Sequence, residues 1–119
     1  MKALICDDDS IVLKLVELTL QEMGLETTTA RDGDEALTLL DSIPRFDLLV
    51  TDIHMPYHNG DVVLQAVRNK DKTIPIVMIS SDADEDVIKM ALKIGVNEFI
   101  TKPVDPGLLK KKVRKLLHI

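Results

Sequence analysis

Charged residues stand at the ends of separate hydrophobic runs in this sequence, where their side chains can meet. Asp7 and Asp8 follow the first run, Asp52 follows a central run, and Lys102 follows the last one. Three carboxylates gathered at one place raise each other's pKa and destabilise the fold, so they require a cation. Oxygen ligands of this kind suit Mg²⁺, which keeps part of its water shell and bridges to phosphoryl oxygens. The pattern therefore predicts a magnesium site that handles a phosphoryl group.

Asp52 is the candidate nucleophile of this site, because a metal-polarised carboxylate can attack phosphorus and form an acyl phosphate. Lys102 can pair with phosphoryl oxygens, and the hydroxyl of Ser80, at the end of another apolar run, can donate a hydrogen bond to one of them. No general base is required, because phosphoryl transfer depends mainly on positioning and charge compensation.

Each of these residues also has a simpler interpretation. An aspartate-rich turn such as Asp7–Ser10 is common at helix N-caps, and Asp9 can be no more than a surface or capping acid. Asp52 can be an ordinary turn residue, and Lys102 can belong to a plain loop before Pro103. Their joint placement at the ends of different apolar runs is what favours one shared site.

Short apolar runs alternate five times with longer amphipathic segments, which predicts strands that alternate with helices. Most of the runs are continuous, as expected of strands that are buried on both faces. This alternation implies right-handed crossovers and a parallel sheet covered on both sides, with ligands bound beyond the carboxyl ends of its strands. The predicted strands are Ala3–Cys6, Glu26–Thr29, Leu48–Thr51, Ile74–Ile79 and Glu98–Ile100.

The helices are predicted from capping residues and apolar spacing. The first is expected to begin at Ser10, with its hydroxyl as the N-cap, and to end before Gly24. Its core-facing stripe is expected to comprise Val12, Leu15, Val16, Thr19, Leu20 and Met23. The remaining helices are expected over Gly33–Ile43, Gly60–Asn69 and Ala83–Ile94, and from Asp105-Pro106 onward.

Size and composition limit the classes of protein to consider. The 119 residues predict a single domain over residues 1–119, and 45% hydrophobic content is enough for a buried core. The net charge of −5 argues against direct nucleic-acid binding. No apolar run approaches the roughly 20 residues that span a bilayer, and the chain reaches Asp7 too early for a signal peptide. The single Cys6, expected to be a buried structural thiol, suits a reducing cytoplasm.

Five segments of the chain, in order and together, resemble the receiver domain of bacterial response regulators, the chemotaxis-regulator-like family. The resemblance implies an α/β fold of the flavodoxin-like (βα)5 type, with three layers and a parallel five-stranded sheet of order 2-1-3-4-5. The resembling segments are Leu4–Asp9, Ala30–Leu37, Phe46–Pro56, Pro75–Ser80 and Phe99–Pro103.

The resemblance also implies a role in two-component or phosphorelay signalling. Asp52 would accept a phosphoryl group from a phosphohistidine on a sensor histidine kinase or a histidine phosphotransfer protein. Asp7 and Asp8 would hold Mg²⁺ together with Asp52 and the backbone carbonyl of His54. The protein would catalyse only its own phosphorylation and dephosphorylation, so it is not expected to be an enzyme that acts on other substrates.

The resemblance assigns further roles beside the acceptor. Ser80 would turn its hydroxyl towards the phosphoryl group and Phe99 would be the aromatic switch residue, although Phe99 can also be a plain core residue. His54 and Asp82 would tune the rate of dephosphorylation, unless they are simply solvated loop residues. Ser81 departs from the family pattern, in which alanine is more usual, and slightly changes access to the site.

Two surfaces are candidate partner sites. Ile11, Leu15 and Leu18 share a face of the first helix and, with the Pro103-Val104 loop, are expected to contact the phosphoryl donor; the alternative is additional core packing. The fourth helix, fifth strand and fifth helix would form the output face. A homodimer could use ion pairs there between acids at 84–86 and bases at 110–115, although these bases can also be a solvated helix face.

Two other functions remain open. A phosphorylation-independent pseudo-receiver would bind partners only, and the intact set of acids, hydroxyl and lysine argues against it. A magnesium-dependent phosphohydrolase with an aspartyl nucleophile usually has a second aspartate two residues later, where this chain has His54. The sequence leaves open whether the chain is a stand-alone receiver or a module of a larger protein.

Overall fold

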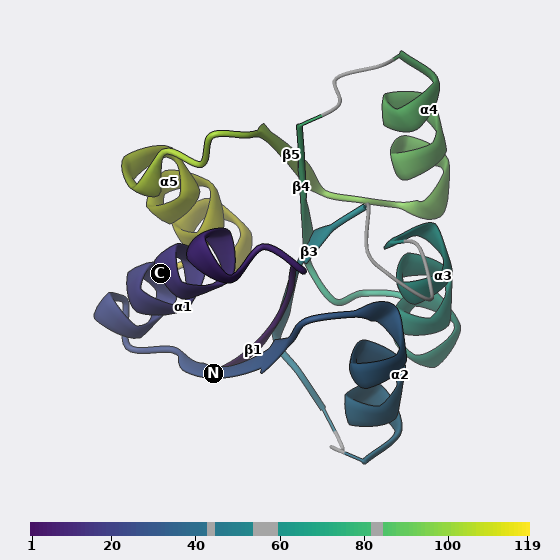
Figure 1. Ribbon diagram of the computed structural model, residues 1–119, viewed down its shortest axis with the longest axis horizontal. Coiled ribbons are helices and arrows are strands. Elements are labelled where there is room, and N and C mark those ends of the chain that lie inside the picture. The colour runs from purple at the N-terminus through teal and green to yellow at the C-terminus, as the bar shows by residue number, and fades with distance from the viewer. Residues whose placement is uncertain (43–44, 54–59, 82–84) are drawn as a thin grey trace.

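Five parallel strands form one sheet in the order β2-β1-β3-β4-β5 (Figure 1). The structure is a computed structural model, and it describes residues 1–42, 45–53, 60–81 and 85–119. Every residue of β3 and β4 is buried, as expected of strands that are covered on both faces. The predicted fold class and strand order are therefore confirmed. The strands are β1 (Lys2–Cys6), β2 (Glu26–Ala30), β3 (Leu48–Asp52), β4 (Ile76–Ser80) and β5 (Glu98–Thr101).

Helices cover both faces of the sheet, with α1 and α5 on one side and α2, α3 and α4 on the other (Figure 1). Because successive strand residues point to opposite faces, Leu4 and Leu49 pack in one hydrophobic cluster, and Ile5 and Val50 pack in the other. None of the described helices has the length and hydrophobicity needed to cross a membrane. The helices are α1 (Ser10–Glu22), α2 (Gly33–Ser42), α3 (Gly60–Lys70), α4 (Glu85–Ile94) and α5 (Pro106–Leu117).

The N-cap prediction for α1 is wrong by one residue. Asp9 is the cap: its backbone is extended, and its carboxylate accepts hydrogen bonds from the N–H groups of Ile11 and Val12. The predicted core stripe also lacks Leu13, which is buried, whereas Leu15 is only half-buried. A helix that packs against both the sheet and α5 needs a wider apolar face than a single stripe.

Strand β4 begins two residues later than predicted, at Ile76. Pro75 has no N–H to give to a strand ladder, and the carbonyl of Ile74 accepts a hydrogen bond from the Arg68 guanidinium instead. The predicted end of the second helix at Ile43 and the predicted start of the fourth at Ala83 lie outside the described residues.

The direction of the chain through the sheet reverses between β1 and β3. The chain goes from β1 outwards to β2 and then returns past β1 to β3, so the connections after β1 and β3 lead to opposite faces of the sheet. In sheets of this kind ligands bind beyond the carboxyl ends of the strands at such a reversal. Asp7 follows β1 and Asp52 ends β3, so the topology alone brings these carboxylates together.

Candidate functional site

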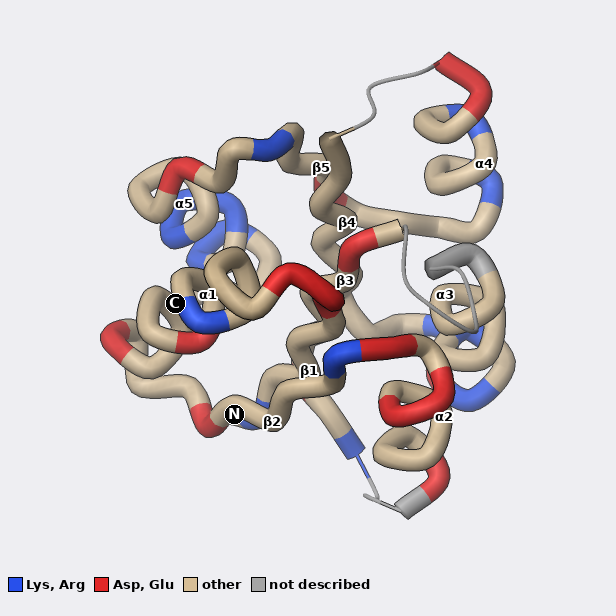
Figure 2. Tube along the Cα trace, viewed as in Figure 1, with Lys and Arg blue, Asp and Glu red and all other residues tan. Residues whose placement is uncertain are grey.

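Three carboxylates meet at the carboxyl ends of β1 and β3. Asp7, Asp8 and Asp52 each offer an oxygen, and these oxygens lie within 4.8 Å of one another. Figure 2 shows the acidic stretch where β1 leads into α1, beside the acidic end of β3. Asp7 and Asp52 are 2% and 4% exposed, whereas Asp8 is exposed to solvent. One edge of the sheet therefore carries two buried carboxylates with a third at the opening.

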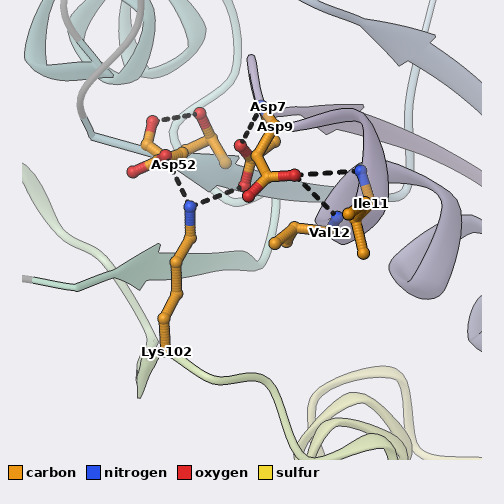
Figure 3. Close-up of polar contacts among 7 residues, drawn as sticks. Asp7, Asp9, Ile11, Val12, Asp52 and Lys102 are labelled. Atoms are coloured by element: carbon orange, nitrogen blue, oxygen red, sulfur yellow. Dashed lines mark hydrogen bonds and ion pairs between the residues drawn. The ribbon is translucent and has the colours of Figure 1, made fainter.

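Lys102 bridges the two buried carboxylates. Its ammonium nitrogen lies 2.9 Å from Asp52 Oδ2 and 3.2 Å from Asp7 Oδ2 (Figure 3). The backbone N–H of Lys102 donates to the carbonyl of Ser80 at 2.9 Å, which fixes the start of this loop against β4, and the bond to Pro103 is cis. Burial lowers the pKa of Lys102, but the hydrogen bond and charge of Asp52 and then Asp7 outweigh it, so the pKa is raised. Lys102 therefore remains a cation at neutral pH.

Asp7 is an incompletely satisfied carboxylate. Its Oδ1 accepts a hydrogen bond of 2.8 Å from the N–H of Asp9, whereas its buried Oδ2 has the Lys102 ammonium at 3.2 Å but no well-formed hydrogen bond among the described residues. Burial, the largest cause, together with the charge of Asp52 raises the pKa of Asp7, although the Asp9 N–H and Lys102 oppose the shift. A buried carboxylate oxygen with no well-formed hydrogen bond, beside two further carboxylates, fits a hard divalent cation with oxygen ligands.

Asp9 does not belong to the carboxylate cluster. Its side chain turns to the start of α1 and caps the helix, as Figure 3 shows. The interpretation of Asp9 as a capping acid is thus confirmed. The three neighbouring acids therefore have two different roles. Asp7 and Asp8 face the site, and Asp9 stabilises the helix that follows.

Ser80 and Phe99 flank the site on the β4 and β5 side. Ser80 is fully buried at the end of β4, one residue beyond Ile79, which pairs with Asp52 in the neighbouring strand. Phe99 is half-buried in β5, where it pairs with Met78 and packs against the hydrophobic cluster beneath α4. Phe99 thus packs on the side of the sheet that α4 covers, and Ser80 lies at the carboxyl end of the strand beside Asp52.

Thr51 is a polar neighbour of the site that the sequence reading did not single out. It is fully buried in β3, and its hydroxyl donates to the backbone carbonyl of Asp52 at 2.9 Å. The only available signal was a hydroxyl directly after the run Leu48-Leu49-Val50 and before Asp52. The residues expected to tune dephosphorylation, His54 and Asp82, lie outside the described residues, as does the His54 carbonyl expected at the metal.

Two apolar side chains on the outer side of α1 are exposed. Ile11 is 79% exposed and Leu18 is 47% exposed, so neither is part of the core, and Leu15 between them is half-buried. In the neighbouring loop Pro103 is exposed and Val104 is buried. An apolar surface therefore borders the carboxylate cluster.

Several lysines of α5 have acidic partners within the same chain. Lys112 pairs with Glu98 of β5 at 2.9 Å, Lys115 approaches Glu98 at 3.6 Å, and Lys110 pairs with Glu22 of α1 at 2.7 Å. The hydrogen bond from Lys112 is the largest cause of a lowered pKa at Glu98. These intramolecular pairs reduce the charge that α5 offers to a second subunit.

Residues 3–114 match the sequence model of the family described as the response regulator receiver domain. The chemotaxis protein CheY of Pseudomonas aeruginosa is 39% identical, and the match covers 99% of this chain and 97% of that protein. The chemotaxis protein CheY1 of Helicobacter pylori strain J99 is 38% identical, with 98% and 97% covered. The response regulator protein PilR of P. aeruginosa is 39% identical, but the match covers 99% of this chain and only 26% of that protein.

Solved structures agree with the sequence relatives. The chemotaxis response regulator CheY4 of Vibrio cholerae superposes with a TM-score of 0.89 at 32% identity, with 98% of both chains covered. A CheY-like receiver domain protein of Methanospirillum hungatei superposes with a TM-score of 0.92 at 26% identity, with 98% of this chain and 93% of that chain covered. The likeness thus extends over the whole sheet and all five helices.

Proposed function

This chain belongs to the response regulator receiver domains of two-component signalling, and on that premise we propose that Asp52 accepts a phosphoryl group from a phosphohistidine. The donor would be a sensor histidine kinase or a histidine phosphotransfer protein. The observation that carries the proposal is the bridge from Lys102 to Asp52 and Asp7, which joins a nucleophile, a cation and an incompletely satisfied acid at one edge. We assign all of residues 1–119 to this one domain, with a cytoplasmic location.

The transfer exchanges one bond to phosphorus for another. A carboxylate oxygen of Asp52 forms the new bond as the phosphorus–nitrogen bond of the donor histidine breaks. The bonding electron pair stays with the imidazole, which leaves neutral when its other nitrogen carries a proton. Lys102 lies 2.9 Å from Asp52 and can follow the oxygens of the arriving group. A carboxylate nucleophile needs no general base, so positioning and charge compensation suffice.

Asp7, Asp8 and Asp52 are the described residues that would hold Mg²⁺, and the backbone carbonyl of His54 is the proposed fourth protein ligand. When bound, the ion supplies positive charge that offsets the carboxylates and the phosphoryl oxygens. The metal would also satisfy Asp7 Oδ2, which forms an ion pair with Lys102 but no well-formed hydrogen bond among the described residues. The exposed Asp8 would be the ligand at the opening of the site.

Phosphorylation would act as a switch through Ser80 and Phe99. The added group carries about −1.5 to −2 charges and three acceptor oxygens. Ser80 would turn its hydroxyl to one of these oxygens, and Phe99 would move inward towards the space that this releases. The output face would be α4, β5 and α5, with homodimerisation as one possible output. His54 and Asp82 would set how long the phosphoryl group remains.

The donor would dock on the exposed side of α1, at Ile11, Leu15 and Leu18, and at the Pro103-Val104 loop. The exposure of Ile11 and Leu18 beside the acceptor supports this assignment. A helical bundle that carries the donor histidine could cover these side chains while its imidazole reaches Asp52.

Incubation with Mg²⁺ and a small donor such as phosphoramidate tests the proposal. Intact-mass spectrometry of the parent is expected to show one added phosphoryl group that depends on Mg²⁺. The matched Asp52→Asn variant, which keeps the size of the side chain, is expected to show none. A folded parent that binds Mg²⁺ but gains no mass from phosphoramidate or acetyl phosphate would contradict the proposal.

A further inference from the structure

One buried hydroxyl in β3, that of Thr51, lies directly before the proposed acceptor. The side chains that share its face of the sheet are apolar or a thiol: Leu49 and Ile53 of the same segment, and its register partners Cys6 in β1 and Met78 in β4. A hydroxyl placed among such groups costs free energy unless it is hydrogen-bonded, whereas valine would keep the shape without that cost. Packing alone therefore gives no reason for a hydroxyl at this position.

The Thr51 hydroxyl restrains the backbone of the next residue. It donates a hydrogen bond of 2.9 Å to the backbone carbonyl of Asp52. Thr51 is thus joined to Asp52 twice, by the peptide bond on the amino side of the Asp52 Cα and by this hydrogen bond on its carboxyl side. The ring that is closed in this way limits rotation about the bond between the Asp52 Cα and its carbonyl carbon. Because Asp52 is the last residue of β3, the restraint acts at the point where the strand ends.

The Cys6 thiol contacts the Thr51 hydroxyl from the neighbouring strand, and a hydrogen bond joins the two side chains. Burial raises the pKa of this thiol to about 12, although the bond with Thr51 opposes the shift, so the thiol keeps its proton at neutral pH. The single hydroxyl proton of Thr51 goes to the Asp52 carbonyl, so the thiol is the donor in its own bond with the hydroxyl. The two bonds orient the hydroxyl towards the carbonyl and join the end of β1 to the end of β3.

The side chain of Asp52 is restrained at its other end. Its Oδ2 lies 2.9 Å from the Lys102 ammonium, and the residue is 4% exposed (Figure 3). Lys102 thus holds the carboxylate, and Thr51 holds the backbone that carries it. Because a misplacement of about 1 Å can slow a reaction about 100-fold, both restraints affect the rate of attack on phosphorus.

We propose that Thr51 is a positioning residue, whose hydroxyl holds the backbone of Asp52 so that the carboxylate points at the incoming phosphorus. The inference rests on the proposed phosphorylation of Asp52. Thr51 acts through Asp52 and takes no part in bond making or breaking. An effect of about tenfold on the rate is expected, at the lower end of the roughly 10- to 100-fold that is typical for loss of a group that orients a metal ligand, because Lys102 still holds the carboxylate.

Substitutions that separate the hydroxyl from the shape of the side chain test the inference. The rate constant for the gain of one phosphoryl group from phosphoramidate is followed by intact mass, with Mg²⁺ saturating for each protein so that weaker metal binding does not enter. Thr51→Val, which keeps the shape and removes the hydroxyl, is expected to react about tenfold more slowly than the parent. Thr51→Ser, which keeps the hydroxyl, is expected to react at nearly the parental rate.

Thr19→Val is the matched control, because Thr19 is also buried and its hydroxyl donates to the Leu15 carbonyl at 2.7 Å, within α1. This variant should lower the urea midpoint, as loss of a buried hydrogen bond does, but keep the parental rate. Urea unfolding also shows that each variant is folded under the conditions of the assay. A parental rate in Thr51→Val, or a rate in Thr51→Ser or Thr19→Val as low as that of Thr51→Val, would overturn the inference.

Should Thr51→Val not fold, Thr51→Ser and Thr51→Ala decide, because both lack the γ-methyl group and differ only in the hydroxyl. Thr51→Ala is then expected to be about tenfold slower than Thr51→Ser, and equal rates would overturn the inference. A parent that gains no mass would refute the proposed function, and this inference with it. A parent that gains mass no faster than its Thr51 variants would refute the inference alone.

Discussion

Asp7→Asn is expected to raise the stability of the metal-free protein, although it removes one residue of the proposed metal site. Asn keeps the acceptor for the Asp9 N–H, which now bonds Asp7 Oδ1 at 2.8 Å. It removes a charge that is almost fully buried and has one oxygen without a hydrogen bond among the described residues. The substitution thus separates the cost of the buried charge from the contribution of the side chain's shape.

The magnitude follows from the charges around Asp7. With an effective dielectric constant of about 20, loss of the attraction to Lys102 at 3.2 Å costs about 5 kcal/mol. Removal of the repulsion between Asp7 and Asp52, whose oxygens lie within 4.8 Å, stabilises the variant by about 3.5 kcal/mol or more. Burial of one carboxylate costs several kcal/mol, which exceeds the remaining difference. A net gain of about 1–3 kcal/mol in the free energy of unfolding is therefore expected.

The pH dependence should have a definite sign. Because the pKa of Asp7 is raised above its ordinary value of 3.8, its contribution to stability is fully present below that value and is lost as the pH rises through the folded-state pKa. The parent should lose this contribution as the pH rises, and Asp7→Asn should not. At neutral pH without metal, the variant should therefore be the more stable protein.

Urea denaturation in EDTA at neutral pH, followed by circular dichroism, measures the effect. Asp7→Asn should show a higher midpoint with an unchanged m-value, and Mg²⁺ should stabilise it less than it stabilises the parent. Asp9→Asn is the matched control, because Asp9 is outside the cluster and Asn is an equally good N-cap. An Asp7→Asn midpoint at or below that of the parent, with Asp9→Asn unchanged, would refute the assignment of Asp7 as a buried, destabilising charge.

Further variants test other parts of the site. Lys102→Gln should lower the free energy of unfolding in EDTA by about 3–5 kcal/mol, because it leaves buried carboxylates unpaired; an unchanged urea midpoint would contradict this. Ile11→Ala and Leu18→Ala should each slow phosphorylation by a donor protein about fivefold, the equivalent of about 1 kcal/mol of apolar contact, but not by phosphoramidate. Parental rates with the donor protein would exclude that docking surface. His54→Ala and Asp82→Ala should lengthen the lifetime of the phosphorylated protein, followed by intact mass after the donor is removed. Unchanged lifetimes in both variants would contradict the assignment of these residues to dephosphorylation.

Much of the site could be predicted from the sequence, because a parallel sheet brings the carboxyl ends of its strands to one edge. Asp7, Asp52 and Lys102 follow three different apolar runs, and the structure brings them into contact. Neither the bridging position of Lys102 nor the unsatisfied oxygen of Asp7 could be predicted, because both depend on distances across the sheet. The family resemblance is confirmed over nearly the whole chain.

Other features depend on contacts that a local sequence pattern does not contain. Asp9 and Ser10 are both good N-caps, and only the extended backbone at Asp9 decides between them. Arg68 looks like an ordinary cation in the last turn of a helix, and its partners Gly95 and Asn97 lie 27 and 29 residues away. The partner of Lys112, Glu98, is on another element, so the basic helix was expected to be free for other contacts.

Chemical mapping of the phosphorylated residue tests the central claim most directly. After reaction with Mg²⁺ and phosphoramidate, borohydride reduces an aspartyl phosphate to homoserine, which peptide fragmentation locates. Homoserine at position 52 alone, and only when both Mg²⁺ and the donor are present, is the predicted result. Homoserine at position 7 or 8, or none under conditions that modify another receiver domain, would contradict Asp52 as the acceptor.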